Sequence, residues 1–221
     1  MKAADLASRI DHTLLRVEAT GADLERHCRQ AIDLGFRAVC VHPARLRRAA
    51  EILAGSSVRL CGVVAFPHGA TTLLSKVFEA LEAWKAGASE LDVVLDLSAI
   101  GSGERAHVEE EVRTIMEKTP ECAHKFIVET GLFTARQLEP VLQVMNQRRP
   151  AYVKTSTGVN GPGATPETVA FLRGKLHASI GVKAAGGIRT LAQAAALLDA
   201  GAACLGTSAG EDLIREAERT G

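Results

Sequence analysis

Short apolar segments rich in β-branched residues alternate with amphipathic segments along the whole chain. The apolar segments have the length of strands, and a stretch with helical periodicity follows each of them. The eight predicted strands are residues 10–15, 37–41, 58–65, 90–95, 124–129, 151–156, 180–184 and 203–206. This alternation predicts a parallel sheet, and near-continuous apolar strands predict that both of its faces are buried.

The number of strand–helix units separates two parallel architectures. An open doubly wound sheet needs only about five or six strands, whereas eight units within 221 residues match a closed (β/α)8 barrel, the TIM barrel. The chain contains no internal repeat, low-complexity tract or linker. We therefore expect residues 1–221 to form a single α/β domain of this kind.

The helix signals are consistent with this reading, with one conflict. Thr165 followed by Pro166 predicts a helix start with an N-cap and a proline in the first turn. Thr134 and Gln137 predict a capping box at the start of another helix. Pro140 lies inside that helix and should kink or shorten it, because proline lacks the amide hydrogen.

Composition restricts the kind of partner that the chain can have. The 26 basic and 26 acidic residues cancel, so no overall field attracts nucleic acid or an anionic membrane. No apolar run approaches the roughly 18 residues of a membrane span, and there is no signal-peptide core. The five cysteines lack C-x-x-C spacing, which favours buried thiols in a reduced compartment. We expect a cytoplasmic protein with small-molecule partners, and a homo-oligomer is compatible with this pattern.

Four charged residues stand inside apolar strand-like segments: Lys154, Lys183, Lys125 and Asp92. Lysine is almost never fully buried unless another group pairs with it or the protein uses it. Because side chains alternate along a strand, these four are expected inside the barrel. A buried ion-pair network without catalytic use is the alternative, but the excess of positive charge serves packing poorly.

Two neighbouring lysines have a chemical use. Like charge disfavours protonation, so each ammonium is expected to lower the pKa of the other. A neutral lysine attacks a carbonyl to form a Schiff base, which weakens the adjacent C–H or the next C–C bond. An aspartate can then carry the proton, directly or through water. Lysine, second lysine and aspartate together predict a class I aldolase.

Glycine-rich turns supply a second part of the predicted site. Gly186 and Gly187 follow the seventh strand, and Gly206 with Ser208 follows the eighth. Backbone amides at helix N-termini bind phosphate, and these two loops form the usual phosphate site of such barrels. Gly158 after the sixth strand would add a third edge.

Seven segments spread over almost the whole chain resemble the deoxyribose-phosphate aldolase family, class I aldolases on a TIM barrel. The segments are Ile-Asp-His-Thr-Leu-Leu at 10–15, Val-Val-Ala-Phe-Pro at 63–67, Glu-Leu-Asp-Val-Val at 90–94, Lys-Phe-Ile-Val-Glu-Thr at 125–130, Val-Lys-Thr-Ser-Thr-Gly at 153–158, Val-Lys-Ala-Ala-Gly-Gly-Ile-Arg at 182–189 and Leu-Gly-Thr-Ser at 205–208. The resemblance implies reversible cleavage of 2-deoxy-D-ribose 5-phosphate to acetaldehyde and D-glyceraldehyde 3-phosphate.

The resemblance also implies roles for single residues. Lys154 would form the Schiff base, and Lys183 would favour its neutral form and assist proton transfer. Asp92 would be the proton donor and acceptor at the carbon that becomes the acetaldehyde methyl group, with Lys125 as a supporting charge. The phosphate would lie against Gly158, Gly186, Gly187, Gly206 and Ser208, and substrate hydroxyls would face Asp11 and Thr13. Neither a metal ion nor an organic cofactor is implied.

Two other readings stay open at this point. A Schiff-base aldolase for another phosphorylated sugar would keep one lysine but would not need this pair of motifs. A non-catalytic barrel that binds a sugar phosphate would be expected to lose a lysine or Asp92, and the sequence retains them.

Overall fold

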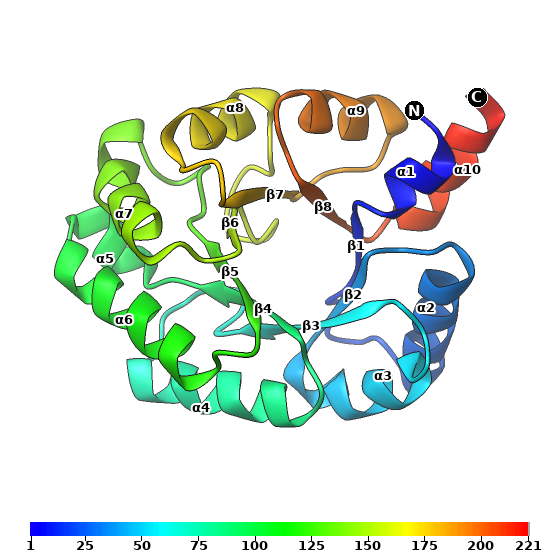
Figure 1. Cartoon of the computed structure of the whole chain (residues 1–221), viewed down its shortest axis with the longest axis horizontal. Coiled ribbons are helices and arrows are strands. Elements are labelled where there is room, and N and C mark those ends of the chain that lie inside the picture. Colours follow the sequence, from blue (N-terminus) through cyan, green and yellow to red (C-terminus); the bar gives the residue numbers. More distant parts are fainter. Residues whose placement is uncertain (221) are drawn as a thin grey trace.

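Eight parallel strands close into a barrel in chain order, with β1 paired to both β2 and β8 (Figure 1). The computed structural model describes residues 1–220. The strands are β1 Ile10–Leu14, β2 Ala38–Val41, β3 Arg59–Val64, β4 Glu90–Val94, β5 Ala123–Ile127, β6 Tyr152–Lys154, β7 Gly181–Ala185 and β8 Cys204–Thr207. The predicted TIM-barrel fold is confirmed.

Helices form an outer ring around the strands (Figure 1). They are α1 Ala3–Ala7, α2 Gly21–Asp33, α3 Leu46–Leu53, α4 Leu73–Lys85, α5 Leu97–Ser102, α6 Arg105–Lys118, α7 Ala135–Arg148, α8 Pro166–Lys175, α9 Leu191–Asp199 and α10 Gly210–Thr220, with a 3₁₀ turn, η1, at Pro43–Arg45. The short α1 packs against α10, which brings the two ends of the chain together (Figure 1).

The apolar core lies between the strands and the helices. Outward-facing strand residues such as Val93, Phe126 and Val182 are fully buried in this layer. Inside the barrel the apolar cluster is small and is built around Cys40 and Cys61. The interior is therefore left to the charged residues, and packing of the outer layer must hold them in place.

Strand register sets the heights of the predicted site residues. Lys154 is directly paired with Lys183 across β6 and β7, and Asp92 is paired with Lys125 across β4 and β5. Residues paired in this way point to the same side of the sheet. The closed barrel thus turns all four side chains into one interior.

Strand β6 is shorter than predicted. Its ladder ends at Lys154, whereas the sequence pattern predicts a strand at 151–156. The hydroxyl groups of Thr155 and Ser156 both donate to the carbonyl of Ala185, at 3.3 and 2.5 Å. Side-chain hydroxyls that bond to backbone groups compete with regular ladders, so the chain leaves the strand directly after the lysine.

Helix α7 is not shortened at Pro140, so that part of the prediction is wrong. The helix runs from Ala135 to Arg148 with Pro140 inside it, and Thr134 and Gln137 form the predicted capping box. The carbonyl that the missing amide would have bonded belongs to Arg136, which is exposed in the first turn. Water can satisfy this carbonyl, so the helix continues.

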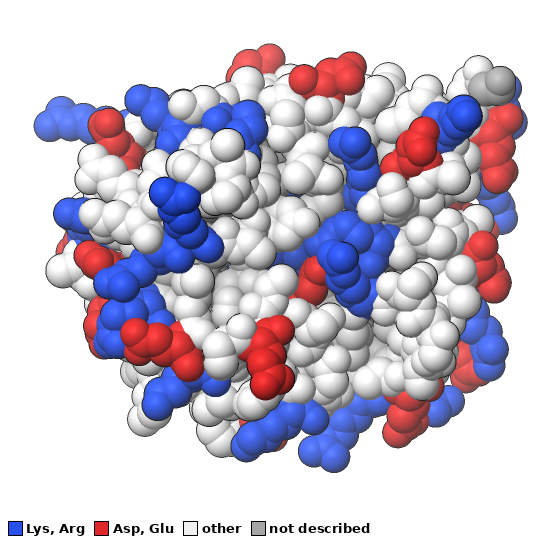
Figure 2. Space-filling view, viewed as in Figure 1, with Lys and Arg blue, Asp and Glu red and all other residues white. Residues whose placement is uncertain are grey.

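The surface carries mixed charge. Basic and acidic side chains are interspersed over the face shown in Figure 2, with a group of basic side chains near its centre, over the barrel. Within residues 1–220, no helix combines the length and the apolar character needed to cross a membrane.

Replacing Pro140 by alanine should raise the free energy of unfolding by about 1–2 kcal/mol, because a backbone hydrogen bond is restored inside the helix. Urea unfolding at constant pH measures this change. Pro166→Ala is the matched control, since Pro166 occupies the first turn of α8, where proline costs no hydrogen bond. Equal shifts for the two variants would contradict the explanation.

Candidate active site

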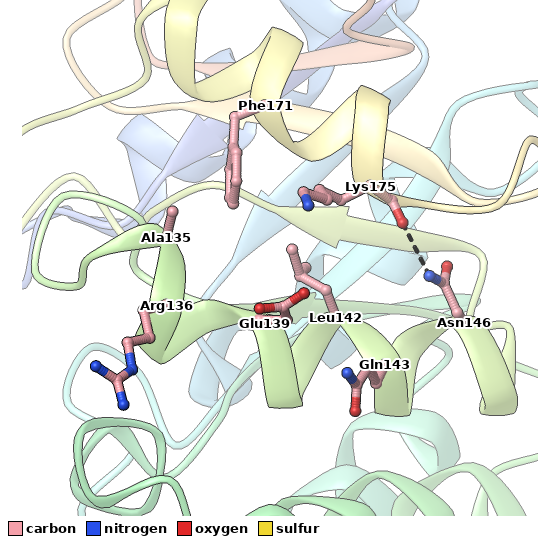
Figure 3. Close-up of a pocket in the computed structure, with 8 residues that line it drawn as sticks. All are labelled: Ala135, Arg136, Glu139, Leu142, Gln143, Asn146, Phe171 and Lys175. Atoms are coloured by element: carbon pink, nitrogen blue, oxygen red, sulfur yellow. Dashed lines mark hydrogen bonds between the residues drawn. The ribbon is translucent and has the colours of Figure 1, made fainter.

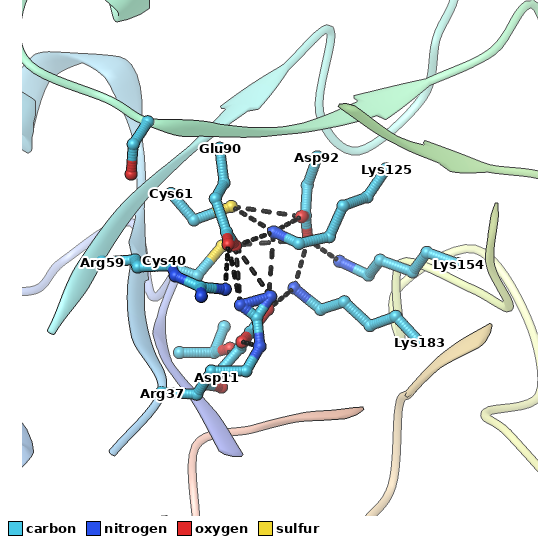
Figure 4. A network of polar contacts seen from close by, with 12 residues as sticks. Asp11, Arg37, Cys40, Arg59, Cys61, Glu90, Asp92, Lys125, Lys154 and Lys183 are labelled. Atoms are coloured by element: carbon cyan, nitrogen blue, oxygen red, sulfur yellow. Dashed lines mark hydrogen bonds and ion pairs between the residues drawn. The ribbon is translucent and has the colours of Figure 1, made fainter. Parts of the chain in front are cut away.

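A group of charged side chains fills the inside of the barrel (Figure 4). We call it the buried charge network, and it consists of Asp11, Arg37, Glu90, Asp92, Lys125, Lys154 and Lys183. Lys154 is the most exposed of its lysines and carboxylates, with only 3% of its surface accessible. These residues come from six different elements or element ends, and only closure of the barrel brings them together.

Asp92 is the centre of the network. Its Oδ2 accepts hydrogen bonds from the Nζ atoms of both Lys154 and Lys183, each at 2.7 Å. Its Oδ1 accepts from Lys125 at 2.9 Å and from the thiol of Cys61 at 3.1 Å. The two lysines of the sequence prediction therefore share one carboxylate oxygen.

A second layer of carboxylates lies toward the N-terminal ends of the strands. Lys183 forms an ion pair with Asp11 at 2.5 Å, and Lys125 forms one with Glu90 at 2.7 Å. Arg37 donates two N–H groups to Glu90 at 2.8 and 2.9 Å, and its Nε lies 3.2 Å from Asp11.

The roles of Glu90 and Arg37 were not predicted from the sequence. Glu90 could have been found, because it lies two residues before Asp92 on the same strand and so faces the same side. Arg37 precedes β2 and had no such signal. Asp11, predicted to face substrate hydroxyls, is fully buried beneath Lys183. Its position suits a charge partner of Lys183 and does not favour direct contact with a substrate.

Electrostatics inside the barrel differ from the expectation of mutually lowered lysine pKa values. Burial alone would lower the pKa of Lys183, but the carboxylates of Asp11 and Asp92 outweigh it and hold this pKa well above its usual value. Burial likewise would raise the pKa of Asp92, and the three surrounding ammonium groups hold it well below its usual range. The prediction is therefore wrong for Lys183, which stays charged.

A cavity of about 560 Å³ opens at the C-terminal ends of the strands and reaches Lys154. No other member of the buried charge network lines it. The cavity also brings together Thr13 and every residue of the predicted phosphate site: Gly158, Gly186, Gly187, Gly206 and Ser208. Arg16 and Arg189, which had no predicted role, complete its rim.

Two of these glycines are required by close approaches of neighbouring atoms. Gly186 has φ +95, and a Cβ there would lie 3.1 Å from the Cα of Gly158, so the two loops approach closely. A Cβ on Gly206 would lie 3.1 Å from the Cε of Lys183. Gly206 thus leaves room for the lysine, a use that the phosphate-loop pattern does not reveal.

Helix N-termini face the same region of the cavity. Helix α9 begins at Leu191 behind the Gly186–Gly187 turn, and α10 begins at Gly210 behind Ser208. Free amides and the positive end of the helix dipole favour an anion at such positions. The cavity therefore combines a rim whose amides favour an anion with one lysine amine at its base.

A metal ion does not suit the interior. Cys40, Cys61 and Asp92 have possible metal-ligand atoms within 4.8 Å of one another. Among residues 1–220 this is the one cluster of three such side chains. The carboxylate of this group already accepts three ammonium groups, and their positive charges oppose a further cation. The donor set therefore fits lysine chemistry better than metal binding.

Another hollow, of about 400 Å³, lies on the outside between α7 and α8 (Figure 3). Phe171 and Leu142 form its apolar part, and Arg136, Glu139 and Lys175 lie around it. None of its lining residues belongs to the buried charge network. Lys154 lines the cavity inside the barrel and not this hollow.

Comparison with known proteins gives a consistent result. The sequence pattern of the DeoC/LacD family aldolases matches residues 6–141. Deoxyribose-phosphate aldolase of Brevibacillus brevis is 39% identical over 212 residues, which are 96% of this chain and 96% of the relative. A putative deoxyribose-phosphate aldolase from Coccidioides immitis has a similar structure, with a TM-score of 0.95 and 35% identity over 99% of this chain and 87% of that one. The tetrameric deoxyribose phosphate aldolase of Aeropyrum pernix has a TM-score of 0.90 and 34% identity over 100% and 94% of the two chains.

Asp92→Asn should lower the free energy of unfolding by roughly 3–5 kcal/mol, because three buried ammonium groups lose their shared partner. Urea unfolding measures the change. Asp96→Asn is the control, since Asp96 caps α5 at the end of the same strand and asparagine caps equally well. A similar stability for both variants would show that Asp92 does not hold the network together.

Proposed function

The chain belongs to the DeoC/LacD family of aldolases, and from this premise we propose how its barrel cleaves 2-deoxy-D-ribose 5-phosphate to acetaldehyde and D-glyceraldehyde 3-phosphate. The activity is that of a deoxyribose-phosphate aldolase, a lyase, since the similarity to such enzymes extends over almost the whole chain. One observation supports the assignment of the reacting group. Lys154 is the one network amine that lines the cavity, and it shares a carboxylate oxygen with a second lysine.

Lys154 is the nucleophile in this proposal. Its amine attacks the aldehyde carbon of the open-chain sugar, and loss of water leaves an iminium. The C2–C3 bond then breaks as the C3 hydroxyl gives its proton to the carboxylate of Asp92, directly or through water, and the bonding electron pair moves into the iminium to form an enamine. Glyceraldehyde 3-phosphate leaves, the enamine carbon takes up a proton, and hydrolysis frees acetaldehyde and the amine.

Asp92 transfers protons in this proposal, and Lys183 compensates its charge. Asp92 touches both lysines through Oδ2, so it can move a proton at the enamine carbon, directly or through water. When Lys154 becomes an imine, Lys183 remains on the same oxygen and keeps the carboxylate compensated. Lys125 compensates the other oxygen of Asp92 in the same way.

The phosphate of the substrate occupies the glycine-lined rim. Backbone amides after β7 and β8 and the N-termini of α9 and α10 supply positive partial charge there. Arg16 and Arg189 add two full charges at the same rim. Thr13 lies on the cavity wall, where a hydroxyl can bond a sugar hydroxyl. Phosphate binding at one end and the amine at the base place the aldehyde carbon next to Lys154.

The cellular setting follows the same reasoning. We propose a cytoplasmic enzyme, because all five cysteines are free and buried as in a reducing compartment. A homo-oligomer is proposed on the basis of the tetrameric relative from Aeropyrum pernix. Residues 1–221 would act as a single catalytic domain.

Borohydride reduction in the presence of 2-deoxyribose 5-phosphate should attach an ethyl group to Lys154, detected by peptide mass. Lys154→Ala should abolish the adduct and reduce turnover by about 1,000-fold or more. Lys175→Ala, which removes an exposed lysine on α8, should leave both unchanged. A folded Lys154→Ala variant with substantial activity would overturn the assigned role.

Lys183→Leu should move the pH dependence of this borohydride trapping to higher pH by about one unit, because loss of a nearby positive charge favours the ammonium form of the nucleophile. Trapping is the right measurement since it does not require turnover. An unchanged profile in folded protein would exclude charge repulsion as the function of Lys183.

A further inference from the structure

The buried charge network contains one more cation than it has carboxylates. Its cations are Arg37, Lys125, Lys154 and Lys183, and its carboxylates are Asp11, Glu90 and Asp92. Uncompensated charge in a dry interior is expensive. Release of one proton from one lysine would leave these seven residues balanced. The thiols of Cys40 and Cys61, which lie against Asp92, are the other titratable groups there.

The three lysines differ in the number of carboxylates with which they form ion pairs. Lys125 is paired closely with both Glu90 and Asp92, and Lys183 with both Asp11 and Asp92. Lys154 is paired with Asp92 alone and is the one that lines the cavity. Of the three lysines it therefore has the fewest carboxylate partners.

Arg37 is the origin of the excess. The guanidinium is nearly buried, with 9% of its side chain exposed, and arginine cannot be deprotonated in a protein. Without it, three lysines would face three carboxylates, and loss of a proton would leave the interior negative. Arg37 reaches neither Asp92 nor Lys154 and contacts the network only through Asp11 and Glu90.

We propose that Arg37 is a positioning residue which supplies the extra positive charge at the floor of the barrel and thereby favours the neutral, nucleophilic form of Lys154. This inference rests on the proposed role of Lys154 in the aldolase reaction. The residue acts at the opposite end of the barrel from the cavity, since it precedes β2 whereas Lys154 ends β6.

Every titratable or charged group around Arg37 must be considered in a test. Besides its two carboxylate partners, these groups are the ring of Tyr152 at 5.3 Å, the buried thiol of Cys204, and Arg59, which contacts the same Glu90. Arg59 is a natural control, because its side chain is 57% exposed and solvent screens its charge. Glu90 retains Lys125 and Arg59 when Arg37 is replaced.

The test is the pH dependence of kcat/KM for cleavage of 2-deoxyribose 5-phosphate. Arg37→Gln should move the midpoint of the acidic limb to higher pH by about one unit. Glu90→Gln removes a negative charge from the same site, so it should move the midpoint to lower pH. The double variant Arg37→Gln/Glu90→Gln restores the original excess and should restore the midpoint. Arg37→Lys and Arg59→Gln should both resemble the wild type.

Opposite shifts for the two single variants cannot arise from general loosening of the barrel, which would lower the rate of both. Midpoints equal to that of the wild type in folded Arg37→Gln and Glu90→Gln would overturn the inference. If Arg37→Gln does not fold, Glu90→Gln and the double variant still test the inference. The midpoint of the acidic limb should move to lower pH in Glu90→Gln and return to the wild-type value in the double variant. Absence of any cleavage by the wild type would instead refute the proposed function.

Discussion

The structure depends on one shared carboxylate. Asp92 accepts three ammonium groups from β5, β6 and β7, so a single residue compensates charges that would otherwise oppose burial. It also holds the amine of Lys154, the proposed nucleophile, at the base of the cavity. Of the three lysines, only Lys154 has Asp92 as its single carboxylate partner, whereas Lys183 also pairs with Asp11 and Lys125 with Glu90.

The two faces of the barrel wall have different roles, and this difference allows charged residues to be buried inside the barrel. Apolar packing is concentrated between the strands and the outer helices, so the interior does not have to supply the hydrophobic free energy. Inside, carboxylates and cations are paired in layers, from Arg37, Asp11 and Glu90 at the floor to Lys154 at the cavity. The rigid outer layer keeps these charges at hydrogen-bonding distances, which preorganises the site for catalysis.

Within the interior, the count of charges matters as much as their identity. Lys183 stays charged because two carboxylates outweigh burial and like charge. Lys154, the proposed nucleophile, has a single carboxylate partner and faces the cavity. Repulsion between the two lysines alone does not describe the site. The balance also includes Arg37, whose effect reaches the nucleophile through Asp11 and Glu90.

The sequence alone determined the barrel, the interior position of Lys154, Lys183, Lys125 and Asp92, and the glycine-rich rim, because strand alternation and loop position are local properties of the chain. Only the tertiary structure decided which residues form ion pairs with these lysines. Asp11, Arg37 and Glu90 meet the lysines across the barrel, and strand closure, which brings together residues far apart in sequence, leaves no local signal for such pairs. The pKa direction of Lys183 was beyond the sequence for the same reason, since it depends on how many carboxylates lie within a few ångströms. Local patterns specify which side chains enter the interior, and closure of the barrel specifies which of them form ion pairs.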